Sequence, residues 1–176
     1  METTEKIVES YCRYIRNWFT ISNIKIKNNE IDLLAIDIAK DIIKKYHIEV
    51  SVSISSSFKK LNDNEFSEEL YKQSGKKAAQ RRTLGYFIEK KFENKEVLER
   101  LSQMGFKKGN YSRIIVSWDF SEDVHKKAKE IGIELWDFKL LLVELGNVLA
   151  KENSYYIDDT LRTIQLYQKA LVETKK

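Results

Sequence analysis

Apolar and polar positions along the first third of the chain predict one helix followed by three strands. In residues 3–19, apolar side chains recur at three- and four-residue spacing, as they do on one face of an amphipathic helix. Residues 21–27 alternate between apolar and polar side chains with one imperfect step, and an Asn-Asn pair then provides a turn. The mainly apolar segments 30–37 and 46–54 follow. The chain therefore opens with a helix and a strand meander.

The remaining pattern predicts helices separated by two short strands. A long polar helix is predicted from Asn64 to about Phe92, with Gly75 and Gly85 as the points where it could be interrupted. The later elements are a helix over 94–104, a buried strand over 114–116, a helix between Ser121 and Gly132, a strand over 133–136, a helix over 138–150 and a final amphipathic helix from Asp158.

The order αβββαβαβ predicts an α/β fold with a mixed β-sheet flanked by helices and with extra C-terminal helices. We expect residues 1–150 to form the core domain. Residues 151–176 are expected to form an amphipathic helix that packs on this core or on a partner subunit. An apolar helix face without a core to cover is often a dimer surface, so a homodimer is one expectation.

Two acidic residues interrupt the apolar strands of the meander. If these strands form an antiparallel hairpin that turns around Lys40 and Asp41, residues whose numbers sum to 81 lie opposite each other. Asp32 then faces Glu49, with Cβ atoms about 4.5–5.5 Å apart. Two carboxylates at this spacing repel each other and can share one divalent cation. The sequence thus predicts a paired acidic site.

The residues around this pair resemble the core of the PD-(D/E)xK nuclease superfamily, which includes restriction endonucleases and archaeal Holliday junction resolvases. The similarity rests on a helix with Glu9, an E-I-D strand at 30–32 and an I-E-V strand at 48–50, and it covers about residues 5–140. It implies a restriction endonuclease-like fold and a nuclease that uses Mg²⁺ or Mn²⁺. The metal ligands that it implies are Asp32, Glu49 and the carbonyl of Val50, with Glu9 as a third acid.

The chain departs from this family at Ser51, where the family has a lysine that supports the attacking water. Serine carries no positive charge and cannot replace that lysine alone. The family allows a lysine to reach in from a neighbouring helix, and we expect Lys76 or Lys77 in this role, with Lys72 as a further candidate. Alternatively the metal acts without a lysine, or the site has decayed.

Simpler interpretations exist for each acidic residue. The strand pair could be solvated at a sheet edge, or salt-bridged to Lys25 or Lys45. Glu9 could form an ordinary ion pair with Arg13, four residues later on the same helix, worth a few tenths of a kcal/mol. Under these interpretations the acids serve stability and bind no metal.

A basic stretch over 72–82 predicts contacts with phosphate groups. It contains five basic residues and no acid, and its basic residues are Lys72, Lys76, Lys77, Arg81 and Arg82. A bound polyanion would relieve their mutual repulsion. Lys107 and Lys108 form a second, weaker basic loop. The alternative is a solvated helix face, which is what most charge runs are.

Composition limits the compartment and the kinds of partner that we expect for this protein. The 176 residues include 31 Lys and Arg and 27 Asp and Glu, a net charge of +4 that is compatible with nucleic acid without requiring it. One cysteine excludes an internal disulfide framework, and no signal peptide or membrane-spanning apolar run is visible. We therefore expect an intracellular, cytoplasmic protein without a membrane partner. Gly-rich phosphate loops and zinc-binding sets are missing from the sequence, which argues against nucleotide cofactors and structural zinc.

The sequence therefore predicts a nuclease, dependent on Mg²⁺ or Mn²⁺, that hydrolyses nucleic-acid phosphodiester bonds, with DNA favoured over RNA. The alternative is a catalytically inactive PD-(D/E)xK-like module for nucleic-acid binding or assembly, which Ser51 and the modest net charge favour. A purely structural protein is a third reading, and it predicts that the basic stretch lies far from the acids.

Overall fold

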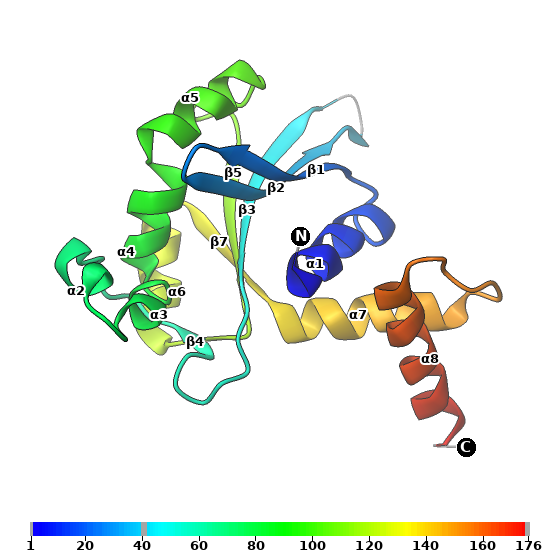
Figure 1. The fold of residues 1–176 in the computed structure, drawn as a ribbon. Helices are drawn as coiled ribbons and strands as arrows, with labels where there is room; N and C mark the ends of the chain where they lie inside the picture. The colour runs from blue at the N-terminus through cyan, green and yellow to red at the C-terminus, as the bar shows by residue number, and fades with distance from the viewer. Residues whose placement is uncertain (1, 40–41, 175–176) are drawn as a thin grey trace.

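A five-stranded mixed sheet with helices on both faces forms the centre of the molecule (Figure 1). The computed structural model describes residues 2–39 and 42–174. The elements follow in the order α1 (Thr3–Tyr14), β1 (Phe19–Ile26), β2 (Asn29–Asp37), β3 (Lys44–Ser51), β4 (Lys60–Leu61), α2 (Glu68–Lys72), α3 (Lys77–Gln80), α4 (Leu84–Tyr86), η2 (Phe87–Phe92), α5 (Lys95–Gln103), β5 (Ser112–Ser117), β6 (Asp119–Phe120), α6 (Glu122–Glu130), β7 (Ile133–Asp137), α7 (Phe138–Lys151) and α8 (Asp159–Glu173).

The sheet has the strand order β1-β2-β3-β5-β7. The meander β1-β2-β3 is antiparallel, whereas β3, β5 and β7 run parallel to one another. Parallel neighbours need crossover connections, and helices between β3 and β7 supply them. The predicted mixed sheet is therefore confirmed, as is the inner position of the apolar strand β5. The short strands β4 and β6 form a separate parallel pair.

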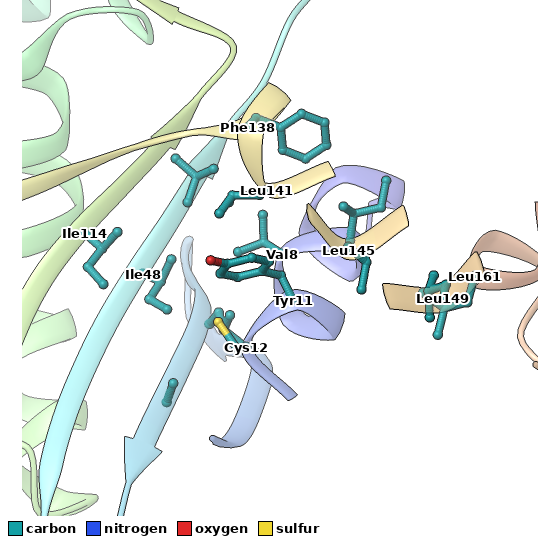
Figure 2. Packing of buried hydrophobic residues seen from close by; sticks show 14 residues of the cluster. Val8, Tyr11, Cys12, Ile48, Ile114, Phe138, Leu141, Leu145, Leu149 and Leu161 are labelled. Atoms are coloured by element: carbon teal, nitrogen blue, oxygen red, sulfur yellow. The ribbon is translucent and has the colours of Figure 1, made fainter. Parts of the chain in front are cut away.

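One face of the sheet carries the larger apolar core, which helices α1 and α7 cover (Figure 2). Ile48 of β3 and Ile114 of β5 contact this core from the sheet side. Val8 from α1 and Leu145 from α7 are fully buried between the layers. This core fixes which face of β3 points away from α1, and that opposite face carries the candidate site.

The opposite face of the sheet is covered by η2, α5 and α6 (Figure 1). Side chains alternate between the two faces of a strand, and Ile48 and Val50 of β3 belong to the first core. His47, Glu49 and Ser51 therefore face the second side, toward η2. The apolar alternation of β3 thus brings its acidic residue beneath a helix.

Two of the sequence-based elements need correction. The helix predicted from Asn64 to Phe92 is divided into α2, α3, α4 and the π-helix η2. Gly75, with a left-handed backbone (φ +78°), lies between α2 and α3, at one of the two predicted interruptions. The other predicted interruption is wrong, because Gly85 lies inside α4, and a turn over 81–83 separates α3 from α4 instead. The first helix ends at Tyr14 instead of residue 19, since Phe19 already belongs to β1. The predicted turn around Lys40 and Asp41 lies outside the described residues.

The C-terminal helix α8 packs on α7 and extends away from the sheet (Figure 1). Its Asp158 cap, predicted from sequence, accepts a hydrogen bond from the backbone N–H of Leu161 at 3.1 Å. Leu161 is buried in the first core, and Gln165 is fully buried and donates to the carbonyl oxygen of Leu149. Tyr167, on the predicted apolar side, is instead 66% exposed. Among the described helices, none has both the length and the apolar character needed to cross a bilayer.

Candidate active site

The antiparallel register of β2 and β3 brings the two strand acids together, as predicted. Leu33 pairs with Ile48, and every described pair between these strands sums to 81. Just beyond the last pair, Asp32 turns its carboxylate toward β3, where Oδ2 accepts a hydrogen bond from the backbone N–H of Val50 at 2.8 Å. Asp32 is 7% exposed, and Glu49 is fully buried. Two carboxylates therefore converge at the place where β2 and β3 separate.

A lysine from the opposite layer contacts both acids. The ammonium Nζ of Lys91 lies 2.5 Å from Glu49 Oε2 and 3.1 Å from Asp32 Oδ1. It also donates a hydrogen bond of 2.8 Å to the carbonyl oxygen of Glu30 on β2. The chain thus supplies a cation between its two acids from the helix layer, and this cation occupies the cluster that the sequence analysis assigned to a metal.

The π-helical turn η2 determines the direction of Lys91. Phe87 and Phe92, at the two ends of η2, are buried in the second core, so the helix is anchored on both sides of the lysine. Lys91 lies four residues after Phe87, on the face that packs against the sheet. Wide π-type turns are frequent at functional sites. Anchoring by two aromatic residues holds the lysine stem against β2 and β3.

His47 completes the buried polar cluster. Its Nε2 lies 2.7 Å from Glu49 Oε1, and both side chains are fully buried. Burial, together with the positive charge of Lys91, lowers the pKa of His47 to about 3, so the ring is neutral. Glu49 is an acceptor, and Nε2 therefore carries the proton. His47 positions the Glu49 carboxylate, while Nδ1 has no hydrogen-bond partner among the described residues.

The electrostatics of the cluster favour a single shared cation. Burial and repulsion from Glu49 raise the pKa of Asp32 to about 7, against the opposing effects of Lys91 and the Val50 N–H. Burial also raises the pKa of Glu49, although Lys91 opposes this. Burial alone would lower the pKa of Lys91, but attraction to the two acids outweighs it and raises that pKa. Lys91 is therefore charged throughout the neutral pH range.

Asp32 and Lys91 of this cluster form part of the floor of a cleft with a volume of about 950 Å³, whereas Glu49 and His47 are fully buried and do not line it. The described residues that line the cleft include seven basic and four acidic side chains. The basic residues are Lys25, Lys27, Lys77, Arg81, Arg82, Lys90 and Lys91, and the acidic residues are Glu2, Glu5, Glu30 and Asp32. The cleft therefore carries an excess of positive charge around a partly buried acidic floor.

The predicted basic stretch only partly lines this cleft. Lys77, Arg81 and Arg82 line it, whereas Lys76 is exposed elsewhere and Lys72 pairs with Glu68 on the surface at 3.5 Å. Arg82 donates to the carbonyl oxygens of Ser51 and Val52, which fixes the wall to the end of β3. The lysine that reaches the acids is thus neither Lys76 nor Lys77.

Three further sequence candidates, Lys107, Lys108 and Glu9, do not line the cleft. Lys108 pairs with Glu93 at 2.7 Å, and its exposed neighbour Lys107 does not line the cleft. Glu9 accepts hydrogen bonds from the hydroxyls of Thr20 and Ser22 on β1.

Glu5, one helical turn earlier in α1, is the α1 acid that lines the cleft. Burial raises the pKa of Glu5, and repulsion from Asp32 contributes to the same shift.

The sequence analysis missed Lys91, but one signal for it exists. In a helix, positions 84, 87 and 91 share one face, and Leu84 and Phe87 are apolar. A lysine in line with them breaks the apolar pattern and indicates a buried counter-charge. This signal identifies Lys91 as a partner of the acids only if the lysine is known to lie beside β2 and β3, whose acids are more than 40 residues earlier in the sequence.

A hard divalent cation fits the acidic pair in part. Asp32 and Glu49 provide carboxylate oxygens, and Glu49 Oε2 accepts no hydrogen bond of regular geometry, although Lys91 lies beside it. The carbonyl of Val50 points to the same strand edge as its N–H, which already contacts Asp32. No group of three or more His, Cys, Asp or Glu side chains in the described ranges is arranged to hold a metal. The donors present are two carboxylates and a backbone carbonyl.

Comparison with protein-family models, with curated proteins and with solved structures gives a clear result. None of them matches this chain.

Proposed function

We propose that this protein is a metal-dependent nuclease that hydrolyses nucleic-acid phosphodiester bonds. The observation that carries the proposal is the position of Lys91, between Asp32 and Glu49 in the floor of a basic cleft. In the PD-(D/E)xK pattern a positive charge accompanies two such acids. Lys91 supplies that charge where Ser51 cannot, which supports the resemblance noted in the sequence.

The roles of the cluster follow from its donors. Asp32, Glu49 and the Val50 carbonyl would hold Mg²⁺ or Mn²⁺, hard cations that prefer oxygen ligands. Such a bound cation supplies Lewis-acid charge and lowers the pKa of a coordinated water. Lys91 would turn its ammonium from the carboxylates to the scissile phosphate and offset its negative charge. His47 keeps Glu49 in place throughout.

The walls of the cleft supply contacts for the rest of the strand. Lys77 and Arg81 present positive charge in the cleft, whereas Lys27, which also lines it, is paired with Glu96 at 2.8 Å. Arginine and lysine side chains neutralise backbone phosphates without reading sequence. The proposed substrate is therefore a nucleic acid bound mainly through its backbone, and DNA is the first form to test.

A second candidate is an inactive nucleic-acid-binding module with the same cleft. It is favoured by the salt bridges of Lys91, which neutralise the acids without metal, and by the convergence of no more than two carboxylates among the residues that the structure describes. In this case the cluster is structural and the basic walls alone act. Metal binding and cleavage separate the two candidates.

The deciding experiment combines calorimetry with cleavage assays. Mn²⁺ is titrated into the native chain, into Glu49→Gln and into Glu9→Gln, a matched control because Glu9 lies outside the cleft. The same proteins are incubated with labelled single-stranded and duplex DNA and RNA in Mg²⁺, Mn²⁺ or EDTA. We expect metal binding and metal-dependent cleavage in the native chain and in Glu9→Gln, and neither in Glu49→Gln. Nucleic-acid binding without metal binding or cleavage would establish the inactive module instead.

A further inference from the structure

One wall of the cleft is aromatic as well as basic. Tyr71 of α2 and Tyr86 of α4 both line the cleft. Their rings stack with centroids 5.9 Å apart and planes inclined by 29°. Phe66 supports both rings from behind in edge-to-face contacts, at 5.4 Å from Tyr71 and 5.6 Å from Tyr86. The tyrosines therefore form a braced platform.

Two basic side chains lie over this platform. Lys77 Nζ is 5.2 Å from the centre of the Tyr71 ring, and the Arg81 guanidinium is 6.0 Å from it. Neither forms a salt bridge within the described ranges, whereas Lys90 on the same wall pairs with Glu68. The platform thus combines a half-buried aromatic face with cations that are not committed to a carboxylate.

Tyr86 of the platform and Lys91 of the acidic cluster belong to the same stretch of helix. Tyr86 precedes Lys91 by five residues in the continuous α4-η2 segment, which is about 7.5 Å along an α-helical axis. Arg82 precedes this segment in the sequence and follows Tyr71. Its hydrogen bonds to the carbonyl oxygens of Ser51 and Val52 fix the start of the segment to the end of β3. A strand that places a phosphate beside Lys91 therefore passes the platform within a short distance.

Resting on the proposed nuclease function, we propose that the Tyr71–Tyr86 platform stacks an unpaired nucleobase, so that the substrate is single-stranded, or is single-stranded beside the scissile phosphate. Bases inside a duplex are stacked on one another and present only their edges in the grooves. An aromatic face beside cations is instead the arrangement that binds single strands, with the ring under a base and the cations on phosphates. Lys77 has a flexible stem and can move from the ring face to the backbone as a base arrives.

The experiment measures binding of fluorescein-labelled oligonucleotides by anisotropy in EDTA, where cleavage does not interfere. The probes are a single strand of about 12 nucleotides, the same strand with one abasic position moved along it, and a matched blunt duplex. The proteins are the native chain, Tyr71→Ala and Tyr71→Phe, which keeps the ring. The abasic series needs no variant and therefore does not depend on how Tyr71→Ala folds.

We expect the native chain to bind the single strand more tightly than the duplex. Tyr71→Ala should weaken single-strand binding by about 5- to 150-fold, the range for loss of one stacked base, and leave duplex binding unchanged. Tyr71→Phe should stay close to native. One abasic position should weaken binding to the native chain and have no further effect on Tyr71→Ala.

Other outcomes overturn the inference in distinguishable ways. Equal binding of single strand and duplex would exclude base stacking, and so would abasic strands that bind as well as intact ones. If duplex DNA is nevertheless cleaved in a metal-dependent way, the proposed nuclease function stands without this inference. Failure to bind or cut any nucleic acid would remove the proposed function and this inference together.

Discussion

The strand position two residues after Glu49 carries no positive charge, and Lys91 supplies that charge instead. Ser51 occupies that strand position, and its carbonyl is held by Arg82. The lysine reaches the acids from η2, in the layer above the sheet, so its side chain approaches from a different direction. The stability of the fold and the proposed function both involve this residue, because it is the counter-charge of two buried acids.

Replacing Lys91 by methionine should destabilise the fold. The change leaves Asp32 and Glu49 buried without a counter-charge, and loss of one partner from a buried ion pair costs about 3–5 kcal/mol. Urea unfolding at pH 8 measures this loss. Lys90→Met is the control, since Lys90 pairs with Glu68 near the surface and should cost less than about 1 kcal/mol. Similar losses in both variants would contradict a buried role for Lys91.

Asp32 makes stability depend on pH. Its pKa is raised from 3.8 to about 7, so the folded protein retains a proton that the unfolded chain releases above about pH 4. Its contribution to stability is therefore complete below pH 4 and is lost as pH rises to about 7. Asp32→Asn does not titrate, and each pKa unit is worth about 1.4 kcal/mol. The unfolding free energy of the variant, minus that of the native chain, should increase between pH 4 and pH 8 in chemical denaturation. A constant difference would be inconsistent with the raised pKa.

At the scale of elements, the strands were predictable and the helix layer above them was not. Alternation and the spacing of two acids are local signals, and they are sufficient for the register of β2 and β3, in which pairs sum to 81. The segment 64–92 is polar and reads as one helix, but its breaks depend on distant contacts. The choice of Lys91 over Lys76 or Lys77 follows from those breaks, so that part of the site could not be predicted.

Gly85 of α4 lies against the backbone of the loop that precedes α2. A Cβ at Gly85 would lie 2.3 Å from the backbone nitrogen of Phe66, and a backbone atom cannot move aside easily. Gly85→Ala should therefore destabilise by about 1–3 kcal/mol, as overpacking does. Gly146→Ala, in the interior of α7, is the control: its Cβ would meet Ile164 at an ordinary 3.6 Å, and it should be neutral or stabilising. Thermal unfolding of both variants measures the contrast, and an unchanged Gly85→Ala would argue against this close approach.

Helix α1 presents two acids, one turn apart, with different surroundings. Glu5 lines the cleft and interacts electrostatically with Asp32, whereas Glu9 is hydrogen-bonded to β1. If a divalent cation binds at Asp32 and Glu49, Glu5→Gln should weaken Mn²⁺ binding on the order of fivefold. Glu9→Gln should leave it unchanged in the same calorimetric titration. The reverse order would place the third acid at Glu9, as the sequence resemblance implies.

On the scale of the whole molecule, the cleft joins two parts of the chain. The acids come from the meander within the first 50 residues, and the lysine and the aromatic wall come from the helical segment that follows. The first core holds the sheet from one side while the second holds η2 against the other. The site is therefore complete only when both faces of the sheet are covered.

Removal of metal should leave the fold intact. Lys91 already neutralises the acids in part, so folding does not depend on a bound cation, in contrast to structural metal sites. We expect the midpoint of thermal unfolding to be the same before and after dialysis against EDTA, and to rise when Mn²⁺ is added, since a ligand of the native state stabilises it. A large drop after dialysis would show that the native protein needs metal to fold.

The lysine between the acids would also couple the two proposed binding events, of metal and of nucleic acid. A cation entering the cluster must compete with the ammonium of Lys91, and the ammonium leaves at low cost only when a phosphate offers it another partner. Metal and nucleic acid should therefore each increase the affinity for the other, by the same factor, because such coupling is reciprocal. In this way a residue that stabilises the fold would also make its acids bind metal more tightly once a substrate is present.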